Sequence, residues 1–156
     1  MDRNQYGEGS SRTILIVDDD VDEARSALNT IGELLPRLRT RAVHSAEDFF
    51  FYLQGEHGFS DRAEFPYPNL VLLDLKMAGL DGFDALLWLR RHPPHNELPV
   101  VVLTEEGELQ LAKSARVLGA RSYLTKPLRV DSSWHRVQRL REWLDFDDSR
   151  APVGLR

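Results

Sequence analysis

An apolar run that ends in an acid, residues 69–74 (NLVLLD), constrains the fold of this chain more than any other feature. Three further apolar runs are also followed at once by polar residues, and the four runs together supply Asp18, Asp19, Asp74, Thr104 and Lys126. In a parallel open sheet, the carboxyl ends of the strands meet in one crevice. The sequence therefore predicts that three carboxylates, one hydroxyl and one ammonium converge on a single site.

Short apolar runs alternate with longer amphipathic runs along the chain. Strands are predicted at 13–17, 39–43, 70–74, 98–103 and 121–124. Helices are predicted at 21–35, 46–54, 83–91, 107–118 and 130–145. Helices of this length between strands imply parallel pairing through right-handed crossovers. The fold class predicted is α/β, a flavodoxin-like (βα)5 doubly wound parallel sheet with strand order 2-1-3-4-5.

Helix caps and loop residues support these elements. Asp20 is a predicted N-cap, and Ser45 begins a capping box with an acid at the third helical position. Gly55 is predicted to end the second helix. Residues 55–68 contain two Gly, two Pro and several charges, so they are predicted to form a long surface loop. The aromatic run at 49–52 exceeds what one buried helix face needs, so part of it is expected to contact this loop.

The composition excludes several classes of function. The net charge is −5, and no basic patch carries interleaved aromatic residues, which argues against nucleic-acid binding. There are no cysteines, so disulfides, thiolate metal sites and thiol catalysis are excluded. No apolar run approaches the ~18 residues of a membrane span, and the polar N-terminus is unlike a secretory signal. We therefore expect a cytoplasmic protein that binds neither nucleic acid nor membrane.

The length of 156 residues favours one domain. We expect a flexible N-terminal segment at 1–11, the domain at 12–146 and a frayed tail at 147–156. After Asp145 only eleven residues remain, which is too few to fold alone, so no output domain is expected to follow.

Three carboxylates in one crevice need a cation or a proton to coexist, because a pair 4 Å apart costs about 4 kcal/mol at an effective dielectric constant of ~20. Mg²⁺ suits such a site, since it prefers hard oxygen ligands and phosphate. Asp74 is the candidate nucleophile toward phosphorus, and Asp18 and Asp19 are the candidate metal ligands. Thr104 can donate a hydrogen bond to a phosphoryl group, and Lys126 can offset its charge.

Each of these residues also has a simpler interpretation as a helix cap, a loop residue or a solvated charge. Their joint placement at four strand ends makes that interpretation weak. The stretches ILIVDDD (14–20), LVLLDLKM (70–77), DGF (81–83), VVVLT (100–104) and GARSYLTKP (119–127) resemble the receiver domain of two-component response regulators. The resemblance covers nearly the whole chain.

This resemblance implies a role for each site residue. Asp74 would accept a phosphoryl group from a phosphohistidine on a sensor histidine kinase. Asp19 would bind Mg²⁺ directly, Asp18 through water, and the backbone carbonyl of Lys76 would be a further ligand. Thr104 and Tyr123 would form a switch pair, in which the hydroxyl moves toward the phosphoryl group and the ring turns inward. Lys126 would contact the phosphoryl group, and its bond to Pro127 is typically cis in this family.

The composition of the 55–68 loop resembles that of receivers that accompany phytochrome-type sensor kinases. A light-sensing kinase is therefore a partner hypothesis, with a histidine phosphotransfer protein as another phosphoryl partner. A homodimer through the fourth helix, fifth strand and fifth helix is a further hypothesis, based on salt bridges from Arg116, Arg121, Arg129 and Arg136.

One departure from the family pattern follows Thr104, where the usual small residue is replaced by Glu105, followed by Glu106. A carboxylate there either narrows access and repels a phosphodonor, or points into solvent. Lys76 can reach across to Glu106 and partly cover the phosphoryl group. This cover predicts slow phosphorylation, slow hydrolysis or both.

The function implied is a protein contact switched by phosphorylation, so the chain is not expected to be an enzyme. The alternative is a phosphorylation-independent dimerisation or adaptor module, which Glu105 favours and the complete set of site residues opposes. A phosphatase-type hydrolase usually needs a second acid two residues beyond its nucleophile, where this chain has Lys76.

Overall fold

The computed structural model describes residues 12–131 and 134–146. The segments predicted at 1–11 as flexible and at 147–156 as frayed lie outside the described residues. Among the helices of the described ranges, none combines the length and the apolar character that crossing a membrane requires.

Five parallel strands form the centre of the molecule. They are β1 (Thr13–Val17), β2 (Arg39–Val43), β3 (Leu70–Asp74), β4 (Val100–Thr104) and β5 (Ser122–Thr125). Their order in the sheet is β2-β1-β3-β4-β5, and every neighbouring pair is parallel. The flavodoxin-like order predicted from the sequence is therefore confirmed.

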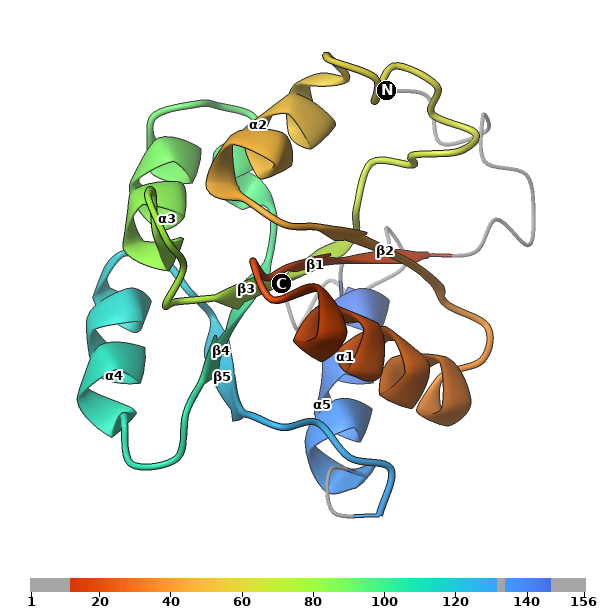
Figure 1. Cartoon of the computed structure of the whole chain (residues 1–156), viewed down its shortest axis with the longest axis vertical. Coiled ribbons are helices and arrows are strands. Elements are labelled where there is room, and N and C mark those ends of the chain that lie inside the picture. The colour runs from red at the N-terminus through yellow and green to blue at the C-terminus, as the bar shows by residue number, and fades with distance from the viewer. Residues whose placement is uncertain (1–11, 132–133, 147–156) are drawn as a thin grey trace.

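Helices cover both faces of this sheet. They are α1 (Val21–Leu34), α2 (Ala46–Gln54), α3 (Gly82–Arg90), α4 (Leu109–Val117) and α5 (Trp134–Phe146), with a short 3₁₀ helix, η2 (His95–Glu97), before β4. Helices α1 and α5 lie on one face, and α2, α3 and α4 lie on the other (Figure 1). The arrangement is the doubly wound one, which leaves the carboxyl ends of the strands open to a site.

Side chains near the helix ends fix where several helices begin. The Asp20 carboxylate accepts hydrogen bonds from two backbone N–H groups at the start of α1, and the Ser45 hydroxyl accepts one at the start of α2. Gly55 ends α2 in the left-handed conformation, with φ of 70°. The predictions for Asp20 and Gly55 are confirmed. Of the capping box predicted at Ser45, the structure has the hydrogen bond from the backbone N–H of Asp48 to the Ser45 hydroxyl. At α3, Asp81 and Asp84 form a reciprocal capping box.

The starts of three elements differ from the prediction by two to four residues, and several other boundaries differ by one residue. Strand β4 begins at Val100 and not at 98, because Leu98 still belongs to the turn that closes η2. Helix α4 begins at Leu109 and not at 107, because Gly107 has φ of 86°, which a right-handed helix does not allow. Helix α5 begins at Trp134 and not at 130, because residues 130–131 form a turn.

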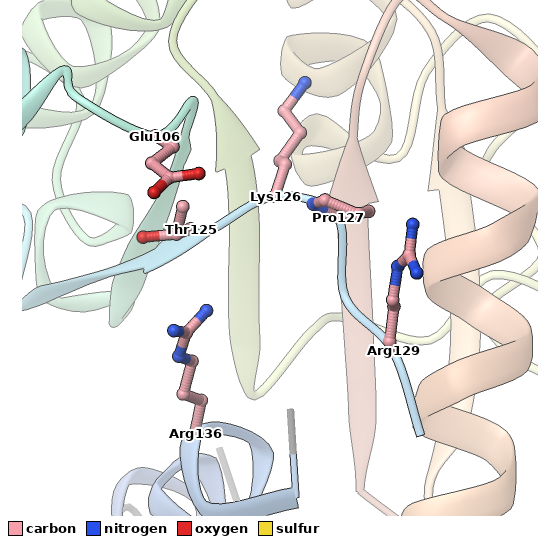
Figure 2. A pocket seen from close by; sticks show the side chains of 6 residues that line it. All are labelled: Glu106, Thr125, Lys126, Pro127, Arg129 and Arg136. Carbon is pink, nitrogen blue, oxygen red and sulfur yellow. The ribbon is translucent and has the colours of Figure 1, made fainter. Parts of the chain in front are cut away.

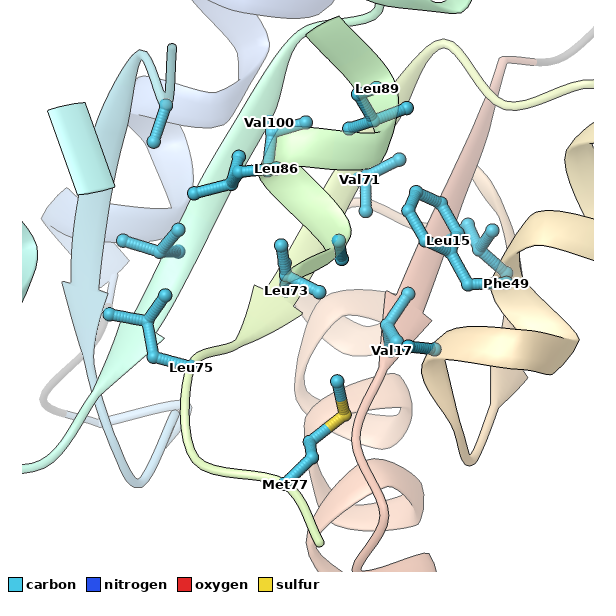
Figure 3. Packing of buried hydrophobic residues seen from close by; sticks show 14 of the residues in the cluster. Leu15, Val17, Phe49, Val71, Leu73, Leu75, Met77, Leu86, Leu89 and Val100 are labelled. Carbon is cyan, nitrogen blue, oxygen red and sulfur yellow. The ribbon is translucent and has the colours of Figure 1, made fainter. Parts of the chain in front are cut away.

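The core has two layers, because alternate residues of the central strands face opposite sides of the sheet. The layer against α2, α3 and α4, part of which appears in Figure 3, takes from the central strands Leu15, Val17, Val71, Leu73, Val100 and Val102. The layer against α1 and α5 takes Ile14, Ile16, Leu70, Leu72, Val101 and Leu103. Strands buried on both faces give the continuous apolar runs seen in the sequence. The polar residues at their ends are therefore held by a closely packed support.

One arginine and a group of aromatic rings hold the loop at 55–68, which contains no helix or strand, as predicted. The Arg62 guanidinium donates hydrogen bonds to three backbone carbonyls at the end of α2 and in the loop. The buried Tyr52 ring contacts Phe59 and Phe65, with ring centroids 5.2 and 6.0 Å apart. The expected contact between the aromatic run of α2 and the loop is confirmed.

Helix α3 approaches the end of β3 so closely that only glycine fits at its first residue. A Cβ on Gly82 would lie 2.6 Å from the carbonyl oxygen of Asp74 and 2.7 Å from the Cα of Leu75. Both are backbone atoms, which cannot rotate away as a flexible side chain would. The position of Asp74 therefore depends on the absence of a side chain at Gly82.

The variant Gly82→Ala is expected to lower the free energy of unfolding by about 1–3 kcal/mol, because the added methyl group displaces the backbone that carries Asp74. The matched control is Gly32→Ala in α1, where nothing lies within 4 Å of an added Cβ. This control is expected to leave stability unchanged or raise it by up to ~1 kcal/mol. Urea unfolding measures both; equal destabilisation of the two variants would contradict the close contact.

Candidate functional site

Side chains from four strand ends meet at one site. Asp18 directly follows β1, Asp74 ends β3 and Thr104 ends β4, and all three are buried. Lys126 follows β5, and its Nζ lies 3.2 Å from Asp74 Oδ1 and 3.6 Å from Asp18 Oδ2. The structure thus brings together residues that the sequence separates by more than a hundred positions.

The Lys126 ammonium lies among four carboxylates, which we call the acid ring. Its Nζ is 2.8 Å from Glu23, 3.2 Å from Asp74, 3.6 Å from Asp18 and 3.8 Å from Glu105. Asp18 and Asp74 are buried, whereas Glu23 and Glu105 are about half exposed. Of the two orientations considered for Glu105, the structure has the one that approaches the site. One ammonium faces four acids, so the acid ring retains excess negative charge.

Burial has the largest effect on the pKa values of Asp18 and Asp74, which we call the inner acids. Burial raises the pKa of Asp18 to about 7, although the backbone hydrogen bond from Asp20 lowers it. Burial also raises the pKa of Asp74, against the lowering effect of the Lys126 charge. Burial lowers the pKa of Lys126, but its hydrogen bond to Glu23 and the charges of Asp74 and Asp18 raise it above the usual value overall. An additional cation at this site would therefore be stabilised.

Asp19 and Asp74 both accept hydrogen bonds from the segment after β3. Asp19 is exposed, and its Oδ2 accepts a hydrogen bond from the backbone N–H of Ala78 at 2.9 Å. The backbone N–H of Lys76 donates to Asp74 Oδ1 at 3.2 Å. This segment is therefore positioned directly by two of the acids predicted for the site.

The two residues expected to form a switch pair differ in exposure. Thr104 is buried, whereas Tyr123, on the neighbouring strand β5, is 41% exposed. The carbonyl of Thr104 accepts a hydrogen bond from the backbone N–H of Lys126 at 2.8 Å. The bond between Lys126 and Pro127 is cis, as the family resemblance implies. Thr104 is thus buried at its strand end, whereas Tyr123 lies at the surface.

The partner expected for the Lys76 side chain needs correction. Its ammonium forms an ion pair with Glu108 and not with Glu106. The turn at Gly107 places Glu108 at the N-cap of α4, toward Lys76, whereas Glu106 lines a cavity with residues of β5 and α5. The ion pair joins the segment after β3 to the segment after β4.

Glu23 is the member of the acid ring that sequence analysis missed. It is the third residue of α1, three positions after the N-cap Asp20, where an acid often bonds back to the N-cap N–H. Here that N–H donates to Asp18 Oδ1 at 2.9 Å instead, so the Glu23 side chain extends to Lys126. The spacing was visible in the sequence, but it does not distinguish a helix cap from a site residue.

The residues of the site fit a hard divalent cation. Carboxylate oxygens of Asp18, Glu23 and Asp74 lie within 4.8 Å of one another. Mg²⁺ prefers such oxygen ligands and commonly takes one or two carboxylates together with phosphate and water. Because the acids outnumber the single ammonium, a divalent cation would also reduce their mutual repulsion.

The variant Glu23→Gln is expected to weaken Mg²⁺ binding by about three- to tenfold, because it removes one charge close to the inner acids. Asp22→Asn is the matched control: it makes the same charge change in the same helical turn, but its side chain is 93% exposed. Isothermal titration with Mg²⁺ compares the two. Equal weakening by both variants would reduce the role of Glu23 to a general surface charge.

The raised pKa of Asp18 predicts a pH dependence of stability without metal. Because its pKa rises from 3.8 to about 7 on folding, stability is present below pH 3.8 and is lost as pH rises through about 7. Asp18→Asn mimics the neutral form of the side chain. The free energy of unfolding of wild type minus that of the variant should therefore fall by up to about 4 kcal/mol between about pH 4 and pH 8. Urea unfolding in a chelator measures this difference, and a flat difference would contradict it. The pKa of His95 is lowered by burial, so its contribution to stability changes with pH in the opposite direction. This contribution is common to wild type and variant, so it cancels in the difference.

Comparisons with known proteins agree with this geometry. The model of the response regulator receiver domain matches residues 14–138. The probable chemotaxis protein CheY of Rhizobium etli is 30% identical over 118 residues, covering 76% of this chain and 83% of that protein. Other curated relatives are much longer: the chain spans 28% of the cyclic di-GMP phosphodiesterase response regulator RpfG of Xanthomonas campestris, which is 29% identical over 116 residues.

Solved structures share both fold and sequence with the chain. Response regulator RPA3017, in red light signalling of R. palustris, is 29% identical with a TM-score of 0.67, covering 86% of this chain and 92% of that one. The Mn²⁺-bound form of response regulator Rcp1 is 26% identical with a TM-score of 0.67, covering 86% of this chain and 95% of that one. Because the family model matches most of the chain and the strand order agrees with it, the chain belongs to the family of response regulator receiver domains.

Proposed function

We propose that Asp74 accepts a phosphoryl group from a phosphohistidine in a reaction that depends on Mg²⁺, and that this changes a protein-interaction surface. The observation that carries the proposal is the buried Asp74 carboxylate, held 3.2 Å from the Lys126 ammonium inside the acid ring. The donor is a sensor histidine kinase or a histidine phosphotransfer protein. In this role the chain is a phosphoryl acceptor and not an enzyme that turns over a metabolite.

The chemistry follows from the positions of the side chains. A carboxylate oxygen of Asp74 attacks phosphorus, and the bond from phosphorus to the imidazole nitrogen of the donor breaks, leaving its electron pair on nitrogen. The product is an acyl phosphate on Asp74. Lys126 would donate to one phosphoryl oxygen, and the hydroxyl of Thr104, at the next strand end, would donate to another.

Mg²⁺ would neutralise charge between the acids and the phosphoryl oxygens. We propose that Asp19 binds it directly, that Asp18 acts through water, and that Asp74 and the Lys76 carbonyl complete the protein ligands. The structure of Rcp1, a similar response regulator, is described as an Mn²⁺-bound form, which supports a divalent cation as the cofactor. Glu23 and Glu105 are then not Mg²⁺ ligands, and both lie close to the Lys126 ammonium.

The structural consequence proposed is a two-state change. When Thr104 donates to the phosphoryl group, space opens beneath Tyr123, and its half-exposed ring turns inward. The phosphoryl group thereby favours one of two arrangements of β4 and β5. The similarity to RPA3017, which acts in red light signalling, supports a light-sensing kinase as the partner. The homodimer through α4, β5 and α5 stays a prediction.

Glu105 favours a second candidate function, a phosphorylation-independent adaptor. Its carboxylate lies 3.8 Å from the Lys126 ammonium, where it competes with a phosphoryl group for the same charge. The retention of Asp74, Thr104 and Lys126 in one buried site is against this second function.

Intact-mass measurement after incubation with Mg²⁺ and acetyl phosphate tests the first proposal. Wild type is expected to gain one phosphoryl group, and Asp74→Asn is expected to gain none, because the amide does not attack phosphorus. The control Asp61→Asn alters an exposed acid of the 55–68 loop and should be phosphorylated as wild type is. Mg²⁺ binding without an adduct from acetyl phosphate or from a histidine kinase would support the adaptor instead.

The Lys76–Glu108 ion pair is expected to lengthen the lifetime of the acyl phosphate, because it joins the two segments that border Asp74 and restricts access of water. An exposed ion pair contributes about 0.2–1 kcal/mol, so Lys76→Ala and Glu108→Gln should each shorten the lifetime by up to about fivefold. Lys113→Ala, an exposed lysine of α4, is the control. Phosphate release after removal of the donor measures the lifetimes. Unchanged lifetimes in both variants would show that the ion pair does not restrict water.

A further inference from the structure

Four carboxylates surround the ammonium of Lys126, which has only three N–H donors. Its Nζ donates a hydrogen bond to Glu23 Oε2 at 2.8 Å and lies 3.2 Å from Asp74 Oδ1. The carboxylates of Asp18 and Glu105 follow at 3.6 and 3.8 Å. The acids thus outnumber the donors. A phosphoryl oxygen that binds this ammonium therefore has to replace one of the carboxylates already there.

Glu23 is the hydrogen-bonded carboxylate that can leave the ammonium most easily. The side chains of Asp18 and Asp74 are 2% and 5% exposed, so water reaches them poorly. The side chain of Glu23 is 46% exposed, so water can hydrate its carboxylate as it separates from Lys126. Glu105 is exposed too, but 3.8 Å is longer than a hydrogen bond, so it holds the ammonium less firmly. The exchange with a phosphoryl oxygen therefore costs least at Glu23.

Helix α1 positions Glu23 for this contact. The backbone N–H of Glu23 donates to the carboxylate of the N-cap Asp20 at 3.1 Å. An acid at this helical position often bonds back to the N-cap N–H, but here Asp18 Oδ1 accepts that hydrogen bond, at 2.9 Å. The Glu23 side chain instead reaches Lys126, 103 positions away in the sequence. The ammonium is thus held by the first turn of α1 as well as by the inner acids.

Glu106 lies near Lys126 but does not replace Glu23 as its partner. Both Glu106 and Lys126 line a cavity of about 380 Å³, together with Thr125 and Arg136. In Figure 2 the Glu106 side chain extends toward Thr125, and the Lys126 side chain extends away from Arg136. In the part of the chain that the structure describes, the acids that form ion pairs with this ammonium are those of the acid ring. The competition for the ammonium is therefore confined to that ring.

We propose that Glu23 is a positioning residue that acts through Lys126: it holds the ammonium in the resting state and has to release it when a phosphoryl oxygen binds. Phosphoryl transfer to Asp74 then includes an exchange. The hydrogen bond from Lys126 to Glu23 breaks, a hydrogen bond from Lys126 to a phosphoryl oxygen forms, and water hydrates the freed carboxylate. This inference rests on the proposed function of Asp74 and adds a residue that limits the rate of that reaction.

Two other roles for Glu23 have different consequences. As a Mg²⁺ ligand, it would assist the transfer, so its removal would slow the reaction even at saturating Mg²⁺. As a general negative charge, it would repel an anionic phosphodonor from any nearby position, so the exposed Asp22 in the same turn would act equally. A positioning role requires contact with Lys126, which a shorter acid at position 23 would lose.

The test follows the intact mass over time with acetyl phosphate, at Mg²⁺ concentrations that saturate each variant. Glu23→Gln is expected to be phosphorylated about two- to fivefold faster than wild type, because a neutral amide competes less for the ammonium. Glu23→Asp keeps the charge but is one methylene too short to reach Lys126, so it should be about twofold faster or more. The control Asp22→Asn, whose side chain is 93% exposed, should change the rate by less than about 1.5-fold in ~0.15 M salt.

The nuclear magnetic resonance signal of the Lys126 ammonium reports the contact itself, without Mg²⁺ or phosphodonor. Its protons are expected to exchange with water at least about twofold faster in Glu23→Gln and Glu23→Asp than in wild type, because one hydrogen bond that protects them is lost. Asp22→Asn should leave this exchange unchanged. A merely structural defect at position 23 would lower the rate of phosphorylation, whereas release of Lys126 raises it.

The outcomes separate this inference from the function on which it rests. Phosphorylation of all variants at the wild-type rate, slower transfer in Glu23→Gln, or an ammonium signal that neither change at position 23 alters would overturn the positioning role and leave the function of Asp74 intact. Glu23→Asp behaving as wild type, or Asp22→Asn gaining as much as Glu23→Gln, would reduce the effect to charge and also overturn it. If neither wild type nor any variant gains a phosphoryl group, the function and the positioning role fail together.

Discussion

The site depends on the ion pairs of the Lys126 ammonium, whose side chain is 11% exposed. The ammonium ties the end of β5 to the acids that follow β1 and end β3, and through Glu23 to the first turn of α1. Without this charge, two carboxylates in a buried crevice would repel each other by about 4 kcal/mol at close range. In the proposed function, the same ammonium would contact a phosphoryl oxygen. The stability of the resting state and the proposed phosphoryl transfer would then both depend on one side chain.

The sheet makes this arrangement possible by holding the strand ends rigidly. Strands buried on both faces leave little freedom to the residues at their carboxyl ends, and Gly82 lets α3 pack directly on the backbone of Asp74. Exposed residues lie at Tyr123 and in the segments after β3 and β4, where the proposed change would take place. The packed strand ends around Asp74 are thus separate from the exposed surface around Tyr123, where the proposed response would take place.

The sequence was enough to predict the strand order and the convergence of Asp18, Asp74, Thr104 and Lys126, because buried parallel strands give continuous apolar runs whose ends must meet. It was not enough to predict contacts that depend on turn geometry. The turn at Gly107 decides that Lys76 pairs with Glu108 and not with Glu106. The hydrogen bond between Asp18 and the N-cap N–H frees Glu23 to reach Lys126, and no spacing rule reveals such an exchange.

A crystal structure of the chain with Mg²⁺ and beryllium fluoride, a mimic of the phosphoryl group, tests the account most directly. The mimic is expected on a carboxylate oxygen of Asp74, with a fluorine within hydrogen-bonding distance of the Lys126 ammonium and another near the Thr104 hydroxyl. A mimic bound at another residue, or an ammonium still held by Glu23 and Asp18 with no contact to the mimic, would contradict the central role of Lys126.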